Sequence, residues 1–561
     1  METQFDVIVI GSGISGSWAA KEFCEKGFKT LVIERGRDVK HVRDYPTAMK
    51  NPWEFDHGGR LPAKIIAENP IVSKCYAFND STAHFFVKDA EHPYQQSQPF
   101  DWIRAYQVGG KGLLWARQVQ RWSENEFLSP ARDGYATSWP IGYSDLKDWY
   151  THVENFIGVS GNLDGLSEIP DGAFLKAWEM NVVEKHIQAQ IQKEFPGRTP
   201  VIGRCAHLTE MNETFAQQGR TQCQARTLCE RGCPFGGYFS PNASTLPAAA
   251  KTGNLTLLTD QIVAEIIYDD QIGKVSCVRV IDRITRTEQL LYAKAFFINA
   301  ATLNTNLILL NSTSERFPNG LGNDAGVLGK FIAFHNYRGK IDAKFDGHLD
   351  RYYYGRRPTA IMMPTFRNVD RQDMAFKGGY MVFYTATREG GGHEVEGAQF
   401  GNEFMQKTTK PGRWAIHMMM QGETIPIEKN QIRLSNKLDT YGIPQLETHI
   451  GYTDNDVLMI EDFLKEGREM LGKSGCTEIV AYDNKQAPGL DIHEIGGVRM
   501  GADPKNSMLN AHNQMHHCLN VFVTDGACMT STGTKNPSLT FMALTARAVD
   551  FAAEQLKSAK I

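Results

Sequence analysis

A glycine-rich turn near the N-terminus restricts the possible folds of this chain more than any other feature. Residues 7–10 are predicted to form a buried strand, which leads into Gly11-Ser-Gly-Ile-Ser-Gly16 and a helix over residues 17–26. A second predicted strand, residues 28–34, ends in the acid Glu34. Such glycines allow a tight turn, close approach of a pyrophosphate and close packing of helix on strand. The sequence therefore predicts a dinucleotide-binding unit of the α/β class, although the turn alone does not separate FAD from NAD.

Composition and charge exclude several other classes of protein. The chain has 561 residues with 60 basic and 64 acidic side chains, and its net charge of −4 provides no general attraction for nucleic acid. No run approaches the roughly 18 apolar residues that a transmembrane helix needs. The N-terminus also lacks the basic, apolar and small-residue segments of a secretory signal, so we expect that the chain does not direct its own export.

Further motifs lie in one early loop and in three segments near the C-terminus. The early loop is Gln107-Val-Gly-Gly-Lys-Gly-Leu-Leu-Trp115. The late segments are His493-Glu-Ile-Gly-Gly-Val-Arg-Met-Gly501, residues 521–527 and Thr534-Lys-Asn-Pro-Ser-Leu-Thr540. After an N-terminal glycine turn, motifs in this order resemble the glucose–methanol–choline (GMC) oxidoreductases. The resemblance covers the whole chain and implies that FAD, not NAD, is the tightly held cofactor.

The resemblance implies an interleaved fold of the α/β class, α+β overall. A Rossmann-like FAD-binding domain is expected to comprise residues 1–158, 222–340 and 484–561, with an insertion at 222–234. A substrate-binding domain, residues 159–221 and 341–483, is expected to build an antiparallel sheet over the substrate. Alternation of side-chain types at 414–420 and 431–435 supports strands in that second domain. The segment near residues 50–95 is expected to form a flap over the flavin.

The FAD contacts follow from the resemblance, residue by residue. Non-covalent FAD is expected because Leu114 stands where some relatives carry the histidine that attaches the flavin. Glu34 is expected to accept hydrogen bonds from the adenosine ribose, and the backbone at Val263 to contact adenine. The expected cofactor-binding residues are Gly11, Gly13, Ser15, Gly16, Glu34, Arg35, Val108, Gly109, Gly110, Trp115, Val263, Ala300, Asp525, Gly526, Asn536, Pro537 and Thr540.

His493 and Asn536 are the predicted catalytic residues. An alcohol gives up a hydride only as its hydroxyl loses a proton, and a near-neutral imidazole suits that task. The resemblance places His493 as the base and Asn536 as the amide that holds the substrate oxygen, both over the flavin. The helix that Pro537 opens would stabilise negative charge on the reduced flavin through its N-terminal dipole. His335 and Asn336 could reach the substrate at the domain junction, but we assign them no role.

Three closely spaced cysteines form an unusual insertion. Cys223, Cys229 and Cys233 have the spacing C-x5-C-x3-C, and Pro234 follows the last of them. Three thiolates favour a 3Fe–4S cluster, whereas zinc would need a fourth ligand such as Cys205. A disulfide with one free thiol is the alternative without a metal. In this fold the spacing resembles the catalytic subunits of bacterial FAD-dependent sugar dehydrogenases, which raises the expectation of a cluster.

The expected activity is that of a dehydrogenase that passes electrons from sugar to FAD, then to the cluster and a protein acceptor. An oxidase that uses oxygen, a lyase with structural FAD and a non-catalytic flavoprotein are the alternatives. Mixed aromatic and polar residues at 351–357 and 402–406 suit a carbohydrate. Residues 49–54 and 75–94 resemble glucoside 3-dehydrogenases, so oxidation of glucose or a glucoside at C3 is expected, with C1 as the alternative.

The partners expected from the resemblance are a small subunit and a cytochrome-type electron acceptor. Export to the periplasm would then depend on a signal carried by the partner subunit, and a cytoplasmic location is the alternative. Nucleic acid is not expected as a partner.

Overall fold

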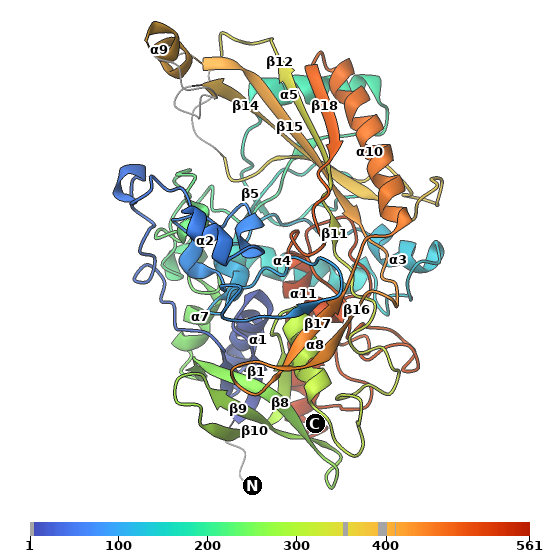
Figure 1. Cartoon of the computed structure of the whole chain (residues 1–561). Coiled ribbons are helices and arrows are strands. Elements are labelled where there is room, and N and C mark those ends of the chain that lie inside the picture. The colour runs from blue at the N-terminus through green and yellow to red at the C-terminus, as the bar shows by residue number, and fades with distance from the viewer. Residues whose placement is uncertain (1–4, 352–356, 391–400, 410) are drawn as a thin grey trace.

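The structure is a computed structural model that describes residues 5–351, 357–390, 401–409 and 411–561. The aromatic residues predicted at 352–356 lie outside the described residues. Two large sheets form separate layers, and in Figure 1 the sheet with β1, β8, β9 and β10 lies below the sheet with β12, β14, β15 and β18. The prediction of a mixed helix and strand architecture is confirmed. No helix among the described residues has the length and apolar character to cross a bilayer.

The lower sheet is the predicted nucleotide-binding unit. Its order is β7-β2-β1-β10-β9-β8, and β19 also pairs with β10. The neighbours β7, β2, β1, β10 and β19 run parallel, whereas β9 and β8 extend the sheet as antiparallel strands. The strand bounds are β1 Phe5–Ile10, β2 Thr30–Ile33, β7 Leu255–Leu258, β8 Gln261–Asp269, β9 Lys274–Asp282, β10 Glu288–Ile298 and β19 Val521–Val523.

Strand β1 is apolar along its length because both faces of the sheet are covered. Val7 and Val9 pack with helices α1 (Ile14–Glu25) and α11 (Ser538–Lys557), while Ile8 belongs to the larger core on the other face. Continuous apolar runs of this kind are typical of buried parallel strands. The glycine turn follows β1 directly, so it lies at the carboxyl edge of the parallel strands, where ligands bind in open α/β sheets.

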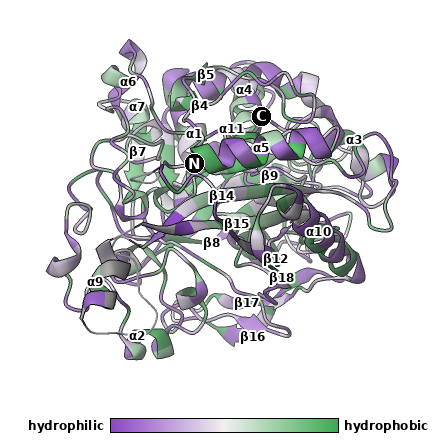
Figure 2. Cartoon of the chain, turned by 90° about the horizontal axis from the view of Figure 1, so that it is seen from above, coloured by the Kyte–Doolittle hydropathy of each residue, from purple (hydrophilic) through white to green (hydrophobic). Residues whose placement is uncertain are grey.

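The upper sheet is antiparallel, with the order β18-β12-β15-β14-β13-β6, and β11 pairs with β15. Helices α5 (Val182–Glu194) and α10 (Asp454–Lys473) flank it and carry both hydrophilic and hydrophobic residues (Figure 2). Their apolar residues form one core with the sheet. The strand bounds are β6 Val201–Ile202, β11 His335–Asn336, β12 Gly339–Phe345, β13 Ile361–Met363, β14 Tyr380–Gly390, β15 Pro411–Glu423 and β18 Thr477–Asp483.

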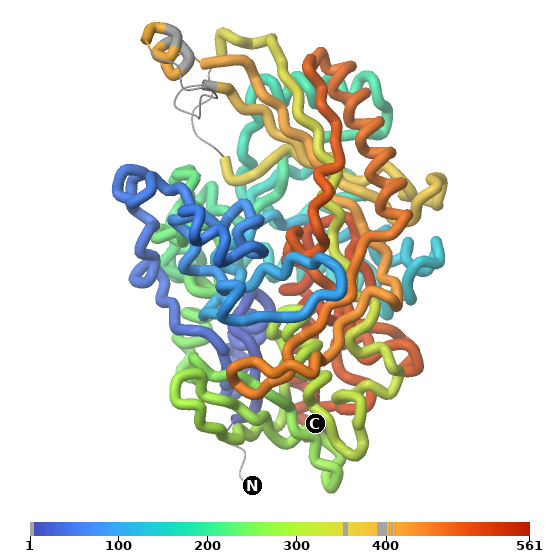
Figure 3. The backbone as a smooth tube through the Cα atoms, in the orientation of Figure 1, coloured from blue at the N-terminus to red at the C-terminus, as the bar shows by residue number. Residues whose placement is uncertain are grey.

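A third sheet corrects one expectation. Residues 431–435 do form a strand, β16 (Gln431–Leu438), but it pairs with β17 (Pro444–His449) and, through β17, with β3 (Gln95–Gln96). Ile432 and Leu446 pack with Phe100 and Leu303 in a core of their own. Alternation predicts a strand but not its partner, because pairing depends on residues far away in the sequence. The orange segment in Figure 3 accordingly runs from the upper layer to the lower one.

The segment near residues 50–95 contains only short helices and packs beside the early glycine loop. Its helix α2 (Ala63–Glu68) and three-residue helices surround a small apolar core that includes Val72, Phe78 and Phe85. Leu113 and Leu114 of the glycine loop belong to the same core. The segment therefore covers that loop and does not join either large sheet.

Candidate active site

A cavity of about 2490 Å³ contains most of the predicted site residues. Its volume exceeds the 300–1,000 Å³ typical of pockets for one small ligand, so it has room for a dinucleotide and a substrate together. Gly16, Val108, Gly109, Cys233 and Thr540 do not line it. The predicted residues that line it are Gly11, Gly13, Ser15, Glu34, Arg35, Gly110, Trp115, Val263, Ala300, His493, Asp525, Gly526, Asn536 and Pro537, together with Cys223 and Cys229.

The three glycines of the N-terminal turn have three different environments. Gly11 has a φ of +96°, and an added Cβ would lie 2.3 Å from the carbonyl oxygen of Asn299. At Gly16 a Cβ would lie 1.9 Å from the carbonyl oxygen of Gly11, so the helix could not approach the turn. At Gly13 a Cβ would meet nothing within 4 Å. Gly13 also begins α1 without a side-chain cap, so the first N–H groups of the helix remain available for a phosphate.

Ser12 joins this turn to two other parts of the site, although the sequence analysis did not select it. The buried carboxylate of Glu34 accepts hydrogen bonds from Ser12 Oγ at 2.6 Å and from its backbone N at 3.2 Å. Ser12 Oγ also accepts a hydrogen bond of 3.0 Å from the backbone N of Gly109. Burial raises the pKa of Glu34, and these donors oppose the shift. Glu34 is therefore held in place at the end of β2, with its remaining surface at the cavity.

The early glycine loop is held by another unpredicted residue, Asn242. Its Nδ2 donates to the carbonyl oxygen of Val108 at 3.0 Å, and its Oδ1 lies 1.9 Å from where a Cβ on Gly109 would be. Gly109 has a φ of +89°, which a residue with a side chain rarely adopts. Val108 and Gly109 thus shape the loop from behind, while Gly110 and Trp115 line the cavity.

Asp525 and Ala300 are linked through Thr305 at the carboxyl ends of β19 and β10. Thr305 Oγ1 donates to Asp525 Oδ2 at 2.6 Å and accepts from the backbone N of Ala300 at 3.1 Å. Burial raises the pKa of Asp525 to about 6. Thr540 lies farther back in α11, where its hydroxyl shares a hydrogen bond of 2.9 Å with Tyr150. The structure thus gives Thr540 a packing role instead of a place in the cavity.

Two histidines and one backbone carbonyl determine which atom of His493 faces the cavity. His335 Nε2 lies 2.9 Å from the carbonyl oxygen of Gly533, and His335 Nδ1 lies 2.9 Å from His493 Nδ1. A carbonyl only accepts, so His335 carries its proton on Nε2 and uses Nδ1 as an acceptor. His493 must then donate from Nδ1, which leaves the lone pair on its Nε2. These two hydrogen bonds therefore assign to His493 the tautomer that a general base requires.

Burial keeps both rings neutral. It lowers the pKa of His335 to about 4. It also lowers the pKa of His493 well below its usual value, and the nearby His335 and Lys111 lower it further. His335 lies on β11 in the upper sheet, whereas His493 lies in the segment after β18. Only the fold brings them together, which is why the sequence analysis assigned no role to His335.

Asn536 and Tyr337 complete the surface around His493. Asn536 Oδ1 is buried and has no hydrogen-bond partner among the described residues, although its residue lines the cavity. The ring of Tyr337 lies 6.1 Å from the ring of His493, and its hydroxyl donates to Gln421. An unpartnered buried amide oxygen is costly, so it is suited to accept a hydrogen bond from a ligand.

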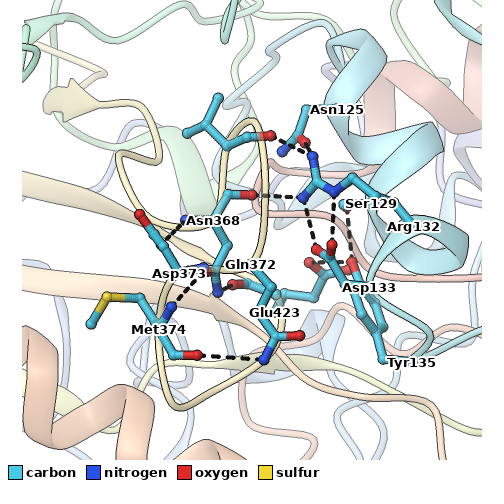
Figure 4. Close-up of polar contacts among 12 residues, drawn as sticks. Asn125, Ser129, Arg132, Asp133, Tyr135, Asn368, Gln372, Asp373, Met374 and Glu423 are labelled. Atoms are coloured by element: carbon cyan, nitrogen blue, oxygen red, sulfur yellow. Dashed lines mark hydrogen bonds and ion pairs between the residues drawn. The ribbon is translucent and has the colours of Figure 1, made fainter.

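The loop that carries Asn536 is fixed by buried charges from both layers. Lys535 pairs with Glu126 of α3 (Glu124–Arg132), and both are almost fully buried. Glu423 of β15 accepts a hydrogen bond of 3.2 Å from the backbone N of Gly533. It accepts another of 3.1 Å from the hydroxyl of Tyr135 (Figure 4). Burial raises the pKa of Glu423 to about 8, and the nearby Glu126 adds to the shift.

Helix α3 is also tied to the segment before β14. Arg132 donates to the carbonyl oxygens of Asn368 at 2.9 Å and Val369 at 2.6 Å (Figure 4). Helix α3, whose Glu126 pairs with Lys535 in the loop of Asn536, is therefore itself attached to the segment between β13 and β14.

His335, Asp491 and His493 have ligand atoms within 4.8 Å of one another, the only such trio found among the described residues. The two Nδ1 atoms already share one hydrogen bond, and Asp491 accepts from the backbone N of His335 at 2.9 Å and of His493 at 3.3 Å. Hydrogen bonding thus accounts for the trio without a metal.

Of the three predicted cysteines, Cys223 and Cys229 line one side of the cavity, whereas Cys233 does not. Burial raises the pKa of Cys223 to about 11, and the neighbouring Cys229 and Cys233 thiolates contribute to the shift. Beside Cys229 lie His207, with Nε2 3.8 Å from the sulfur, and the buried Arg117, whose Nε and Nη1 have no partner among the described residues. Cys229 thus lies beside a buried cation, but the sulfur atoms of the three cysteines do not all lie within 4.8 Å of one another, and the iron–sulfur cluster stays a prediction.

Comparison with known proteins identifies the family of these motifs. Two models described as GMC oxidoreductase match residues 141–335 and 426–545, and a model described as NAD(P)-binding Rossmann-like domain matches residues 9–72. Paromamine 6'-oxidase of Streptomyces fradiae is 26% identical over 99% of this chain and 92% of its own. The fructose dehydrogenase large subunit of Gluconobacter japonicus is 24% identical over 98% of each chain. Pyridoxine 4-oxidase from Mesorbium loti shares the fold, with a TM-score of 0.58 and 16% identity over 98% of each chain.

Alanine substitutions at two neighbouring glycines should separate FAD binding from folding. Gly13→Ala should leave the free energy of unfolding of the FAD-free protein unchanged but weaken FAD binding at least about tenfold, because the methyl group enters cavity space. Gly16→Ala should destabilise the protein by about 1–3 kcal/mol or more, because its methyl group meets a backbone carbonyl. FAD titration and chemical unfolding measure the two effects. Equal losses of FAD affinity and stability at both positions would contradict this division.

Glu423→Gln should change how stability depends on pH. The pKa of Glu423 is about 8 in the folded chain, against about 4 for an unfolded glutamate. The folded state therefore keeps a proton that the unfolded state releases, so this stabilisation is lost as the pH rises from about 4 to 8. Relative to the parent, Glu423→Gln should gain up to about 1.4 kcal/mol per pH unit across that window. Chemical unfolding of both holoproteins at several pH values tests this, and parallel curves would refute it.

Proposed function

Because this chain belongs to the GMC oxidoreductase family, we propose that it is an FAD-dependent sugar or glycoside dehydrogenase. We propose oxidation of the C3 hydroxyl of glucose or a glucoside to a 3-keto sugar. The family establishes an oxidoreductase that acts on CH–OH groups with FAD. The observation that carries the proposed chemistry is the unprotonated Nε2 of His493 beside Asn536 in a cavity shared with the glycine turn.

The protein residues account for the proton and the orientation of the substrate. His493 Nε2 accepts the hydroxyl proton, while its Nδ1–H remains bonded to His335, so the developing charge on the ring has a hydrogen-bond acceptor. Asn536 Oδ1 accepts a hydrogen bond from a second hydroxyl of the substrate, since the proton of the reacting hydroxyl goes to His493, and so orients the reacting carbon. Bound FAD supplies the acceptor for the hydride. The residues at the turn fit FAD, since Gly13 leaves space for its pyrophosphate and α1 begins with free N–H groups.

The roof of the cavity supports a polar substrate. Thr385, Thr387 and His417 project from β14 and β15 and line the cavity beneath the upper sheet. Hydroxyl groups of a sugar need donors and acceptors of this kind. The name of one relative, the fructose dehydrogenase large subunit, agrees with a carbohydrate.

We propose that Cys223, Cys229 and Cys233 hold a 3Fe–4S cluster, which would supply one-electron transfer. The position of Cys223 and Cys229 at the cavity and the unpartnered nitrogens of Arg117 beside Cys229 support an anionic centre at this place. A small partner subunit, a cytochrome-type acceptor and export to the periplasm with that subunit belong to the same proposal. The relative named as a large subunit supports an assembly of more than one chain.

An oxidase that uses oxygen is the second candidate, favoured by the name of the relative that is 26% identical. It would not depend on the three cysteines. Oxidation of glucose at C1 is the alternative for the same dehydrogenase.

Anaerobic flavin bleaching tests the proposed reaction. Methyl glucoside should reduce the flavin, because its blocked C1 leaves C3 available, and free glucose should do so as well. His493→Ala should keep FAD but lower the rate of reduction by roughly 10²–10⁴-fold, the contribution of a general base. Stopped-flow absorbance measures both, with the conservative variant His493→Gln as a second test of the base. Bleaching by glucose but not by methyl glucoside would overturn the C3 assignment, and near-parental rates in His493→Ala would remove the base.

Cys229→Ser tests the electron route. The variant should lose iron while its flavin is still reduced by sugar, and reduction of a protein acceptor should fall at least about tenfold. Cys277→Ser on β9, where the thiol lies in the lower sheet, is the matched control and should keep its iron. Iron and sulfide analysis with electron paramagnetic resonance measures the effect. Equal iron content in the parent and in Cys229→Ser would refute the ligand assignment.

A further inference from the structure

We propose that Lys340 forms an anion-binding subsite and that the preferred substrates are sugars with a carboxylate remote from the reacting carbon. The inference rests on the proposed function, because it concerns the same cavity. It adds the charge of the substrate, which neither the family nor the sequence motifs specify.

The fold directs Lys340 into the cavity. Side chains alternate along β12, so Ile341, Ala343 and Phe345 pack in the core beneath α5 and α10. Lys340 and Lys344 therefore lie on the opposite face, and Lys340 lines the cavity together with Tyr337.

Lys340 has no carboxylate within ion-pair distance among the described residues. Its Nζ lies 3.5 Å from the sulfur of Met419, a weak acceptor. The nearest acid on the same strand, Asp342, is already bonded to His417 at 2.8 Å and to Tyr482 at 3.0 Å. Lys344, by contrast, pairs with Glu389. Two lysines on one face of one strand thus differ in whether the protein supplies a counter-charge.

Burial makes this arrangement costly without a ligand. It lowers the pKa of Lys340 to about 8, and the charge of Asp342 only partly opposes the shift. At pH 7 the side chain is still mainly an ammonium ion, so it presents positive charge to a partly desolvated cavity. A bound carboxylate would restore the lost solvation through a charge-assisted hydrogen bond.

The position of Lys340 relative to the base sets where the carboxylate must lie. Lys340 Nζ is 5.6 Å from the centre of the Tyr337 ring, and that ring is 6.1 Å from the ring of His493. One aromatic ring therefore separates the ammonium group from the base. A pyranose ring that contacts Tyr337 with its apolar face would place a carboxylate at Lys340 while its ring hydroxyl meets His493.

The test compares methyl glucoside with methyl glucuronoside, which differ only in the carboxylate at C6. Anaerobic flavin reduction should show a lower KM for the glucuronoside in the parent. Lys340→Met should raise that KM at least about tenfold, the scale of one charge-assisted hydrogen bond, and change the KM for the glucoside less than about threefold. Lys344→Met is the matched control and should change neither. Lys340→Arg, which keeps the charge, should retain the preference.

The pH dependence gives a second readout. As the pH rises past 8, the preference of the parent for the glucuronoside should decline because the free amine carries no charge, and Lys340→Met should show no such decline. If neither compound bleaches the flavin, the proposed function fails. If the glucoside bleaches it but the glucuronoside has the higher KM, or if Lys340→Met affects both equally, only the subsite fails. Flavin content and unfolding of each variant confirm that it has folded.

Discussion

The carbonyl oxygen of Gly533 accepts a hydrogen bond from His335, and the rest of the active site depends on that contact. Because a carbonyl has no proton to donate, it determines the tautomer of His335 and, through it, the tautomer of His493. Asn536 follows three residues after Gly533. The orientation of the base and that of the amide are therefore set by one short segment, and a movement of this segment would disturb both.

That segment is held by parts of the chain that are distant in sequence. Glu126 and Lys535 join it to α3, while Glu423 and Gln421 join it to β15 of the upper sheet. An interleaved fold makes this possible, since the layer that roofs the cavity and the layer that carries the glycine turn both contact the loop. Two buried carboxylates face one lysine there, and a proton on Glu423 relieves their repulsion.

The sequence predicted the parts of the site whose chemistry is local. The glycine turn, Glu34, His493 and Asn536 lie in short motifs, and the fold places all of them at one cavity. Ser12, Asn242 and His335 could not be selected in this way, because each acts through a partner more than 20 residues away. A common serine or asparagine in a loop carries no signal of such a contact. The pairing of β16 was missed for the same reason, since its sheet joins residues near 95, 431 and 444.

Buried charges in the cavity differ in how they are neutralised, and that difference carries information about ligands. Lys111 pairs with Glu494, so the cost of burying that lysine is met within the protein. Lys340 has no such partner among the described residues, and Arg117 leaves two of its nitrogens without one although it also contacts Glu230. Folding stability alone would favour replacing such groups by apolar ones of similar size. A cation kept in this state is explained most simply by an anion that arrives after folding. At Arg117 the proposed anion is the iron–sulfur cluster, and at Lys340 it is the substrate.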